Sequence, residues 1–219
     1  MRINKYVANA TGLSRRTIDN LIKENKIKVN GSIALIGQEI NDGDEVSVDE
    51  KKVRPNKDYL SIILNKPVGF ISSRDGQGQK TVYELLPKDY ATLKIVGRLD
   101  KNSSGLILLT NNGVLAYKLT HPKFKKVKKY FVEIDKPLTK EHEQKIINSK
   151  VILDGMPSNM YLSPKDSSGQ LWLIEMHEGR NRQIRRTFEQ LNYRVLALKR
   201  IQFDKYKLDN LKEGQYIKV

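Results

Sequence analysis

The sequence has no cysteine among its 219 residues, which excludes disulfide bonds, thiolate metal sites and cysteine nucleophiles. It also has no run approaching the roughly 20 apolar residues that span a bilayer. The N-terminal residues lack the apolar core of a signal peptide. The three histidines, at positions 121, 142 and 177, are too scattered to resemble a metal site. These absences predict a cytoplasmic protein without a metal ion.

Basic residues are abundant and clustered. The chain has 40 Lys and Arg against 25 Asp and Glu, a formal charge of +15. Residues 118–130 hold six lysines and no acid, and residues 180–200 hold seven Lys or Arg against one acid. Charges that served only solubility would be mixed more evenly with acids. The clusters indicate a nucleic-acid partner, with an anionic membrane as a distant second.

Residues 1–50 predict a small, helix-rich unit. Apolar residues recur at helical spacing before Gly12, which ends the first helix. Ser14 can cap a second helix with a buried stripe of aliphatic residues, which leaves Arg15 and Arg16 on its outer face. The pair Asn30-Gly31 predicts a tight turn after a short strand, and residues 45–48 alternate as a second strand.

The rest of the chain predicts a linker and a larger α+β domain. Residues 51–58 are dense in charge and contain a proline, which is typical of a linker. Beyond them, strands are expected at 59–65, 92–97, 106–110, 129–134, 170–176 and 195–203, and helices at 113–119, 139–148 and 181–192. The short connections favour a mixed, mainly antiparallel sheet over a doubly wound parallel one.

The segment GRLDKNSSGLILLTNNG, residues 97–113, places Asp100 at the end of an apolar strand. A rigid strand end can present such a side chain to a cleft. More often an aspartate in a loop hydrogen-bonds its own backbone and stabilises a turn. Spacing alone favours the turn.

The same segment resembles the active-site motif of RNA pseudouridine synthases, in the RsuA-type branch that modifies ribosomal RNA. NKPVGFISS, HPKFKKVKKYFVEI, EGRNRQIRR and LKEGQYIKV agree with that branch in the same order. SRRTIDNLI followed by IKVNG resembles an RNA-binding module named after a ribosomal protein. The resemblance implies that residues 59–219 form a catalytic domain that isomerises a flipped uridine without a cofactor, with Asp100 as the catalytic carboxylate.

The resemblance also implies roles for other residues. Tyr130 would stack on the target base, Arg185 would pair with Asp100, Leu198 would line the pocket, and Arg98 would fill the vacated stack or hold a phosphate. By composition alone, Tyr130 would be a core residue and the arginines a solvated helix start. The expected phosphate contacts are Lys126, Lys128, Lys129, Arg182 and Arg186, and those of the N-terminal module are Arg2, Lys5, Arg15, Arg16 and Lys28.

Several alternatives remain open at the level of sequence. Asp100 can attack the ribose or the pyrimidine ring. The chain can also be a non-catalytic RNA-binding factor of ribosome assembly, or a synthase acting on transfer RNA. We expect a monomer that acts on ribosomal RNA or pre-ribosomal particles, with the large subunit slightly favoured.

Overall fold

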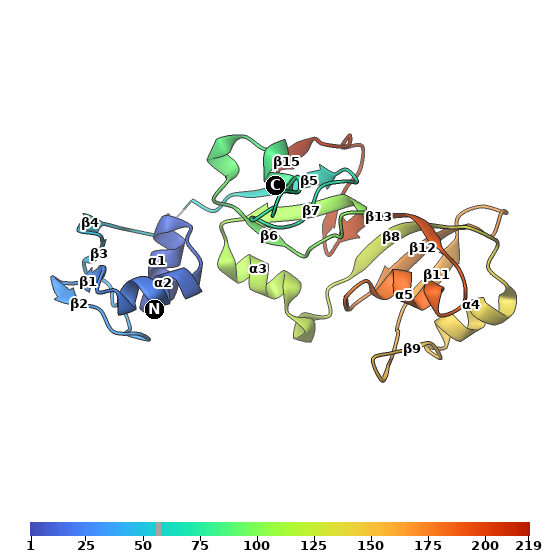
Figure 1. Cartoon of the computed structure of the whole chain (residues 1–219), viewed down its shortest axis with the longest axis horizontal. Helices are drawn as coiled ribbons and strands as arrows, with labels where there is room; N and C mark the ends of the chain where they lie inside the picture. The colour runs from blue at the N-terminus through green and yellow to red at the C-terminus, as the bar shows by residue number, and fades with distance from the viewer. Residues whose placement is uncertain (56–57) are drawn as a thin grey trace.

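The computed structural model describes residues 1–55 and 58–219, so Asn56 and Lys57 of the predicted linker lie outside the described residues. The molecule is elongated, with the N-terminal unit at one end and the helices α4 and α5 near the other (Figure 1). The strands that carry the C-terminus lie between these ends.

The N-terminal unit packs two helices on a small antiparallel sheet. Gly12 ends the first helix in the left-handed conformation (φ 77°), and the Ser14 hydroxyl accepts a hydrogen bond from the backbone N–H of Thr17, as its capping role predicts. Asn30 and Gly31 both have positive φ, which confirms the predicted tight turn. The elements are α1 (Ile3–Thr11), α2 (Arg15–Lys23), β1 (Ile27–Val29), β2 (Ser32–Ile33), β3 (Val46–Val48) and β4 (Lys51–Lys52), with strand order β2-β1-β3-β4.

The last of these strands corrects the predicted linker. Lys51 and Lys52 pair with Val48 and Ser47 of β3, so the first two residues of the segment 51–58 belong to the N-terminal sheet. β4 is an edge strand of this sheet, and exposed lysines on an edge strand discourage pairing with a further strand. The core of this unit is a separate cluster of aliphatic side chains, which includes Ile3, Val7 and Ile18.

The remainder of the chain is built on a large mixed sheet. Among the described residues, every strand pair in it is antiparallel except β7 with β13, so the predicted mainly antiparallel sheet is confirmed. The main path is β11-β12-β8-β13-β7-β5-β15, with β14 on β13 and β6 on β7. The strands are β5 (Ser61–Lys66), β6 (Lys94–Val96), β7 (Ser104–Thr110), β8 (Lys128–Ile134), β11 (Tyr161–Pro164), β12 (Leu171–Met176), β13 (Val195–Phe203), β14 (Tyr206–Lys207) and β15 (Tyr216–Lys218).

The single parallel pair joins two half-sheets. Gly105 of β7 lies opposite Arg200 of β13, with φ 101°. A Cβ at Gly105 would collide with the carbonyl oxygen of Arg200, so only glycine allows the two strands to approach this closely. The strands that carry the predicted catalytic segments therefore meet at a point fixed by one glycine.

Helices cover the sheet and supply the rest of the core. One cluster lies between the half-sheet β8, β12 and β13 and the helices α4 and α5. In the other half-sheet alternate residues face opposite sides: Ile63 packs with Leu119 of α3, whereas Ile62 and Leu64 pack with Val82. These elements are α3 (Gly113–Thr120), α4 (Lys140–Ile147) and α5 (Gln183–Glu189), with short 3-10 helices η1 (Val82–Leu85), η2 (Lys88–Tyr90) and η3 (Pro122–Phe124).

The two units touch at the end of α1. A Cβ at Gly12 would lie 3.3 Å from the Cβ of Thr92, in the loop before β6. Arg15 is close enough for its charge to lower the pKa of Lys94, after the larger effect of burial. The basic helix α2 thus lies on the side of the N-terminal unit that faces the large mixed sheet. In the described part of the chain, no helix is long and apolar enough to cross a membrane.

Candidate active site

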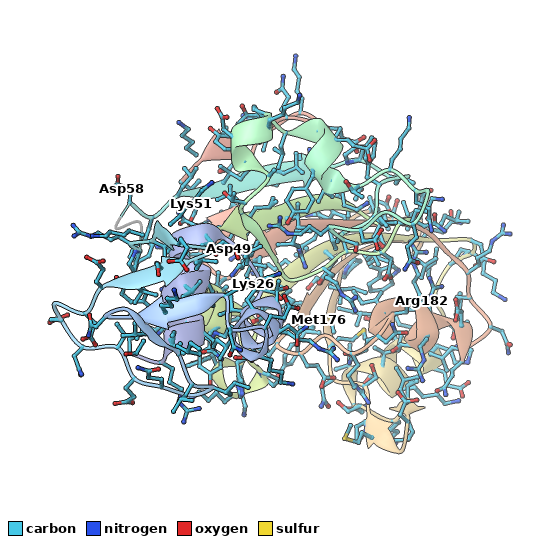
Figure 2. The ribbon with its side chains drawn as sticks, turned by 60° about the vertical axis from the view of Figure 1, so that its left-hand side comes forward. Lys26, Asp49, Lys51, Asp58, Met176 and Arg182 are labelled. Carbon is cyan, nitrogen blue, oxygen red and sulfur yellow. The ribbon has the colours of Figure 1, made fainter. Side chains whose placement is uncertain are left out.

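A cavity of about 510 Å³ opens beside the junction of the two half-sheets. Its wall combines the loop 97–103, the end of α3, strands β8 and β13, and the loop from β12 to α5; Figure 2 labels Met176 and Arg182 in this last part. Among the described residues that line it, six are Lys or Arg and only two are acids, Asp100 and Glu178. Such a surface favours a polyanion. The predicted site residues on this wall are Arg98, Asp100, Lys126, Lys128, Tyr130, Arg182 and Leu198.

The loop that carries Asp100 is held by its own backbone carbonyls. The oxygens of Leu99, Asp100, Lys101, Asn102 and Ser103 each accept at least one hydrogen bond. The donors come from five places along the chain: Lys66, Gly69, Ser72, Ser103 and Arg185. A loop this fully bonded has little freedom, so the carboxylate of Asp100 is presented to the cavity in a fixed place.

Lys66 lies directly beneath this loop. Its side chain is fully buried, and its ammonium donates to the carbonyls of Pro67 (2.9 Å) and Ser103 (2.7 Å). Burial lowers the pKa of Lys66 to about 8, while the negative charge of Asp100 acts in the opposite direction. Lys66 of the motif NKPVG therefore supports the loop that carries Asp100.

Arg185 does not form the expected ion pair with Asp100. Within the described residues, no nitrogen of Arg185 lies within 4.0 Å of that carboxylate. Its guanidinium instead donates to the carbonyl of Asn102 (2.7 Å) and to that of Val195 (2.9 Å). Asp100 is still close enough that its charge partly offsets the lowering of the Arg185 pKa by burial. Arg185 thus acts on Asp100 through the backbone two residues further along the loop.

Tyr130 and Leu198 form an apolar wall beside the carboxylate. Tyr130 is 7% exposed and Leu198 8%, and both pack in one cluster with Leu99. Tyr130 lies opposite Arg200 in the pairing of β8 with β13, and Leu198 lies opposite Val132. An aromatic ring and an aliphatic side chain next to Asp100 suit the faces of a planar base.

A buried cation, Arg200, and a half-buried one, Lys128, face the same cavity. Arg200 is 1% exposed and donates to the carbonyls of Leu106 (2.7 Å) and Gly97 (2.9 Å). Lys128 lies over the ring of Phe203, 5.5 Å from its centroid, and donates to the carbonyl of Glu178 (3.2 Å). Burial, and next the charge of Arg200, lower the pKa of Lys128 to about 8. Arg200 was not among the predicted site residues, although a charged residue within an apolar strand is a usable signal.

Most of the other expected phosphate contacts are already ion-paired. Lys126 pairs with Asp204 (3.1 Å), Lys129 with Glu175 (2.9 Å), Arg182 with Glu189 (3.6 Å), Arg186 with Asp154 (2.6 Å) and Lys28 with Glu50 (2.7 Å). Lys129 and Arg186 also lie outside the wall of the cavity. By contrast, no carboxylate within the described ranges pairs with Arg98, nor with the module residues Arg2, Lys5, Arg15 and Arg16.

The segment EGRNRQIRR holds a hairpin at the rim of the cavity. The hairpin joins β9 (Ile152–Leu153) to β10 (Met156–Pro157), and Met156 reaches the cavity wall. Arg180 donates to the carbonyls of Leu153 (2.8 Å) and Pro157 (2.7 Å). With the ion pair of Arg186, two arginines of this motif therefore shape the site rather than face solvent. The pair Asp154-Gly155 has positive φ at both residues and is a tight-turn signal that could have predicted this hairpin, although its strands have only two residues each.

The described residues contain no cluster of His, Cys, Asp and Glu that could hold a metal ion. What the site offers is one carboxylate on a rigid loop, an apolar wall for a flat ring, and cations around both. This combination suits a flat, uncharged ring that is attached to a polyanion.

Comparison with known proteins identifies the class of enzyme. Residues 59–190 match the family model described as RNA pseudouridylate synthase, and residues 1–46 match the S4 domain. Ribosomal large subunit pseudouridine synthase B of Bacillus subtilis is 36% identical over 97% of this chain and 89% of its own length. The dual-specificity RNA pseudouridine synthase RluF of Escherichia coli is 32% identical over 99% of this chain and 74% of its own.

The fold agrees with these matches. A crystal structure of a pseudouridylate synthase superposes with a TM-score of 0.72 at 28% identity, covering 100% of this chain and 96% of that one. The chain belongs to the RNA pseudouridine synthase family, and it carries an N-terminal S4 domain.

Proposed function

We propose that the protein converts uridine to pseudouridine in ribosomal RNA, with Asp100 as the catalytic carboxylate. The observation that carries this proposal is the position of Asp100, on a loop whose five successive carbonyls are hydrogen-bonded, at the wall of a cation-lined cavity. The names of the relatives, one of which is a large-subunit enzyme and another a dual-specificity enzyme, support an RNA substrate. We favour large-subunit RNA.

The reaction needs no redox partner. The bond from N1 of uracil to C1′ of ribose breaks and a bond from C5 to C1′ forms. The proton on C5 is lost and N1 gains one, so atoms and electrons balance without a cofactor. Asp100 can serve as a nucleophile at the ribose or at the ring, and its carboxylate can also stabilise a positive ribose intermediate.

The surrounding residues then have distinct roles. Tyr130 and Leu198 hold the flipped base, and Arg98, which is exposed at the cavity mouth, occupies the gap it leaves or holds its phosphate. Lys128 and Arg200 supply positive charge to the wall. Arg185 is a positioning residue, since it reaches the loop only through the carbonyl of Asn102.

The N-terminal unit serves as a second RNA contact. We propose that residues 1–52 form a separate RNA-binding domain and residues 59–219 the catalytic domain, and that the unpaired cations Arg2, Lys5, Arg15 and Arg16 contact phosphates. Phosphate contacts supply affinity with little sequence information. The selection of the uridine is therefore assigned to the catalytic cavity. We expect a cytoplasmic monomer.

The test is the substitution Asp100→Asn, which keeps the size of the side chain and removes its charge. The substrate is ribosomal RNA isolated from cells that lack the protein. On this RNA the variant should form pseudouridine at least 10⁴-fold more slowly than the wild type, on the order of the loss of an essential nucleophile, with RNA affinity nearly unchanged. The matched control is Asp89→Asn, an exposed aspartate of η2, which should keep full activity. Pseudouridine formed at the same rate by Asp100→Asn would disprove this role.

A further inference from the structure

An exposed group of aromatic rings adjoins the cavity that contains Asp100. It consists of Tyr117, His121 and Phe124, at the end of α3 and in η3, and is called the ring platform below. The ring centroids of Tyr117 and His121 are 4.8 Å apart, and those of Tyr117 and Phe124 are 5.7 Å apart with the planes nearly perpendicular. His121 and Phe124 are 6.3 Å apart. Each ring thus contacts both of the others.

The ring platform is not part of the hydrophobic core. The side of α3 that faces the sheet carries Leu115, Ala116 and Leu119, which pack with the core cluster around Leu106. Tyr117 is 47% exposed, and the ring of His121 is exposed as well. Large aromatic side chains gain most from burial, so aromatic rings clustered at the surface indicate a contact with something outside the protein.

The backbone holds the ring platform in place and connects it to the cavity. The N–H of His121 donates to the carbonyl of Tyr117 (3.0 Å), and the N–H of Lys123 donates to Nδ1 of His121 (3.3 Å). Thr120, His121 and Pro122 line the same cavity as Asp100. A strand of nucleic acid that leaves the cavity on this side therefore passes His121, whose ring contacts the other two. α3 lies between the N-terminal unit and the strands β8 and β13 (Figure 1).

Positive charge surrounds the rings. The ammonium of Lys123 lies 4.9 Å from the centroid of Phe124 and 5.3 Å from that of Tyr117. Lys118 and Lys125 are exposed beside it. None of the three lysines pairs with an acid among the residues that the structure describes. Aromatic rings that alternate with unpaired cations bind the bases and phosphates of a single strand.

We propose that the ring platform binds single-stranded RNA next to the target uridine, by stacking an unpaired base on Tyr117 and His121. Lys118, Lys123 and Lys125 contact the phosphates on either side. This inference rests on the proposed function, because it takes the strand in the cavity to be RNA. A duplex cannot use the rings in this way, since its bases are already stacked and paired. The ring platform would thus select an open loop around the modified uridine.

The experiment measures binding of three RNA probes to the full chain carrying Asp100→Asn, so that no product forms. The probes are a single-stranded 12-mer with a central uridine, the same 12-mer with abasic residues flanking that uridine, and a duplex of equal length. Tyr117→Ala should weaken binding of the single strand about tenfold. It should leave the duplex and the abasic strand unchanged. Tyr117→Phe should bind as the parent does, because the hydroxyl takes no part in stacking.

The matched control is Tyr161→Ala, which removes a still more exposed tyrosine (64%) from β11; its binding should equal that of the parent. Equal binding of the single strand by the parent and Tyr117→Ala, or an equal loss with the abasic strand, would overturn the proposal. Pseudouridine formation by the wild-type chain is measured separately on ribosomal RNA. Its absence would overturn the proposed function, whereas a wild-type rate with Tyr117→Ala would overturn only the ring platform.

Discussion

Lys66 is a buried lysine whose ammonium group supports the loop that carries Asp100. Its pKa is about 8 in the folded chain and about 10.4 in an unfolded one. Below pH 8 both states hold the proton, and the full penalty of a buried ammonium applies. Between these values the unfolded chain binds the proton that the folded chain has released, so the free energy of unfolding rises with pH.

The substitution Lys66→Met should remove this pH dependence. The variant loses the contacts to the loop carbonyls, so it is less stable at pH 7. Between pH 7 and pH 10 the free energy of unfolding of the wild type should rise by about 1–2 kcal/mol relative to that of the variant. Urea unfolding at both pH values measures the difference. Lys88→Met, at an exposed site, should track the wild type; a constant wild-type advantage over Lys66→Met would contradict the assignment.

Arg185 gives a second test at this scale, because its contact with the catalytic loop runs through a carbonyl. Arg185→Lys cannot reach both Val195 and Asn102 with a planar fork. A small displacement of Asp100 should lower kcat about 100-fold, with KM for RNA nearly unchanged. Arg194→Lys, at an exposed position, is the control. A rise in KM at constant kcat would instead assign Arg185 to RNA binding.

Side-chain chemistry at the site was only partly predictable from the sequence. Motif order identified Asp100, Tyr130 and Leu198, and the structure brings all three to one cavity. The partners of Arg185 could not be predicted, because they are backbone carbonyls that lie 10 and 83 residues away along the chain. The ion pairs of Lys126 and Arg186 were missed for the same reason: the acids come from distant segments.

At the scale of elements, hydrophobic periodicity predicted the long helices and strands and missed the shortest strands. The expected helices and the six expected strands all form, and the side chain of Thr139 caps the first turn of α4. The strand expected at 59–65 begins at Ser61, and the helix expected at 181–192 is shorter, Gln183–Glu189, because Arg182 and Asn192 adopt positive φ. Strands β9, β10 and β14 were not predicted, since two residues show no alternation.

The junction of β7 with β13 depends on Gly105. Gly105→Ala places a Cβ against the carbonyl of Arg200 at φ 101° and should cost about 3 kcal/mol in the free energy of unfolding. It should also lower activity, because β7 follows the catalytic loop directly. Gly113→Ala is the matched control: nothing lies within 4 Å of its Cβ, so its stability should equal or exceed that of the wild type. Chemical denaturation measures both, and equal stability of the two variants would refute the role of Gly105.

The whole molecule distributes its charge unevenly. Residues 1–50 contain seven Lys or Arg and eight Asp or Glu, a net charge of −1, so the rest of the chain carries +16. The N-terminal unit therefore attracts RNA only through a local face. Arg15 and Arg16 of α2 form that face, close to Lys94 of the catalytic sheet. Two positive surfaces side by side can hold one continuous strand or stem.

Removal of that face should weaken binding most in low salt and so reduce its salt dependence. Each lost phosphate contact flattens the plot of log K against log salt by about 0.7 to 0.9. The double substitution Arg15→Gln with Arg16→Gln should therefore reduce the slope by about 1.5. Lys26→Gln with Lys52→Gln removes the same charge from residues paired with Glu24 and Glu45, and should leave the slope nearly unchanged. Titrations of a ribosomal RNA fragment between 50 and 300 mM salt, about the range over which such slopes are linear, distinguish the two. Equal slopes for both double variants would mean that only total charge matters and that α2 presents no RNA-binding face.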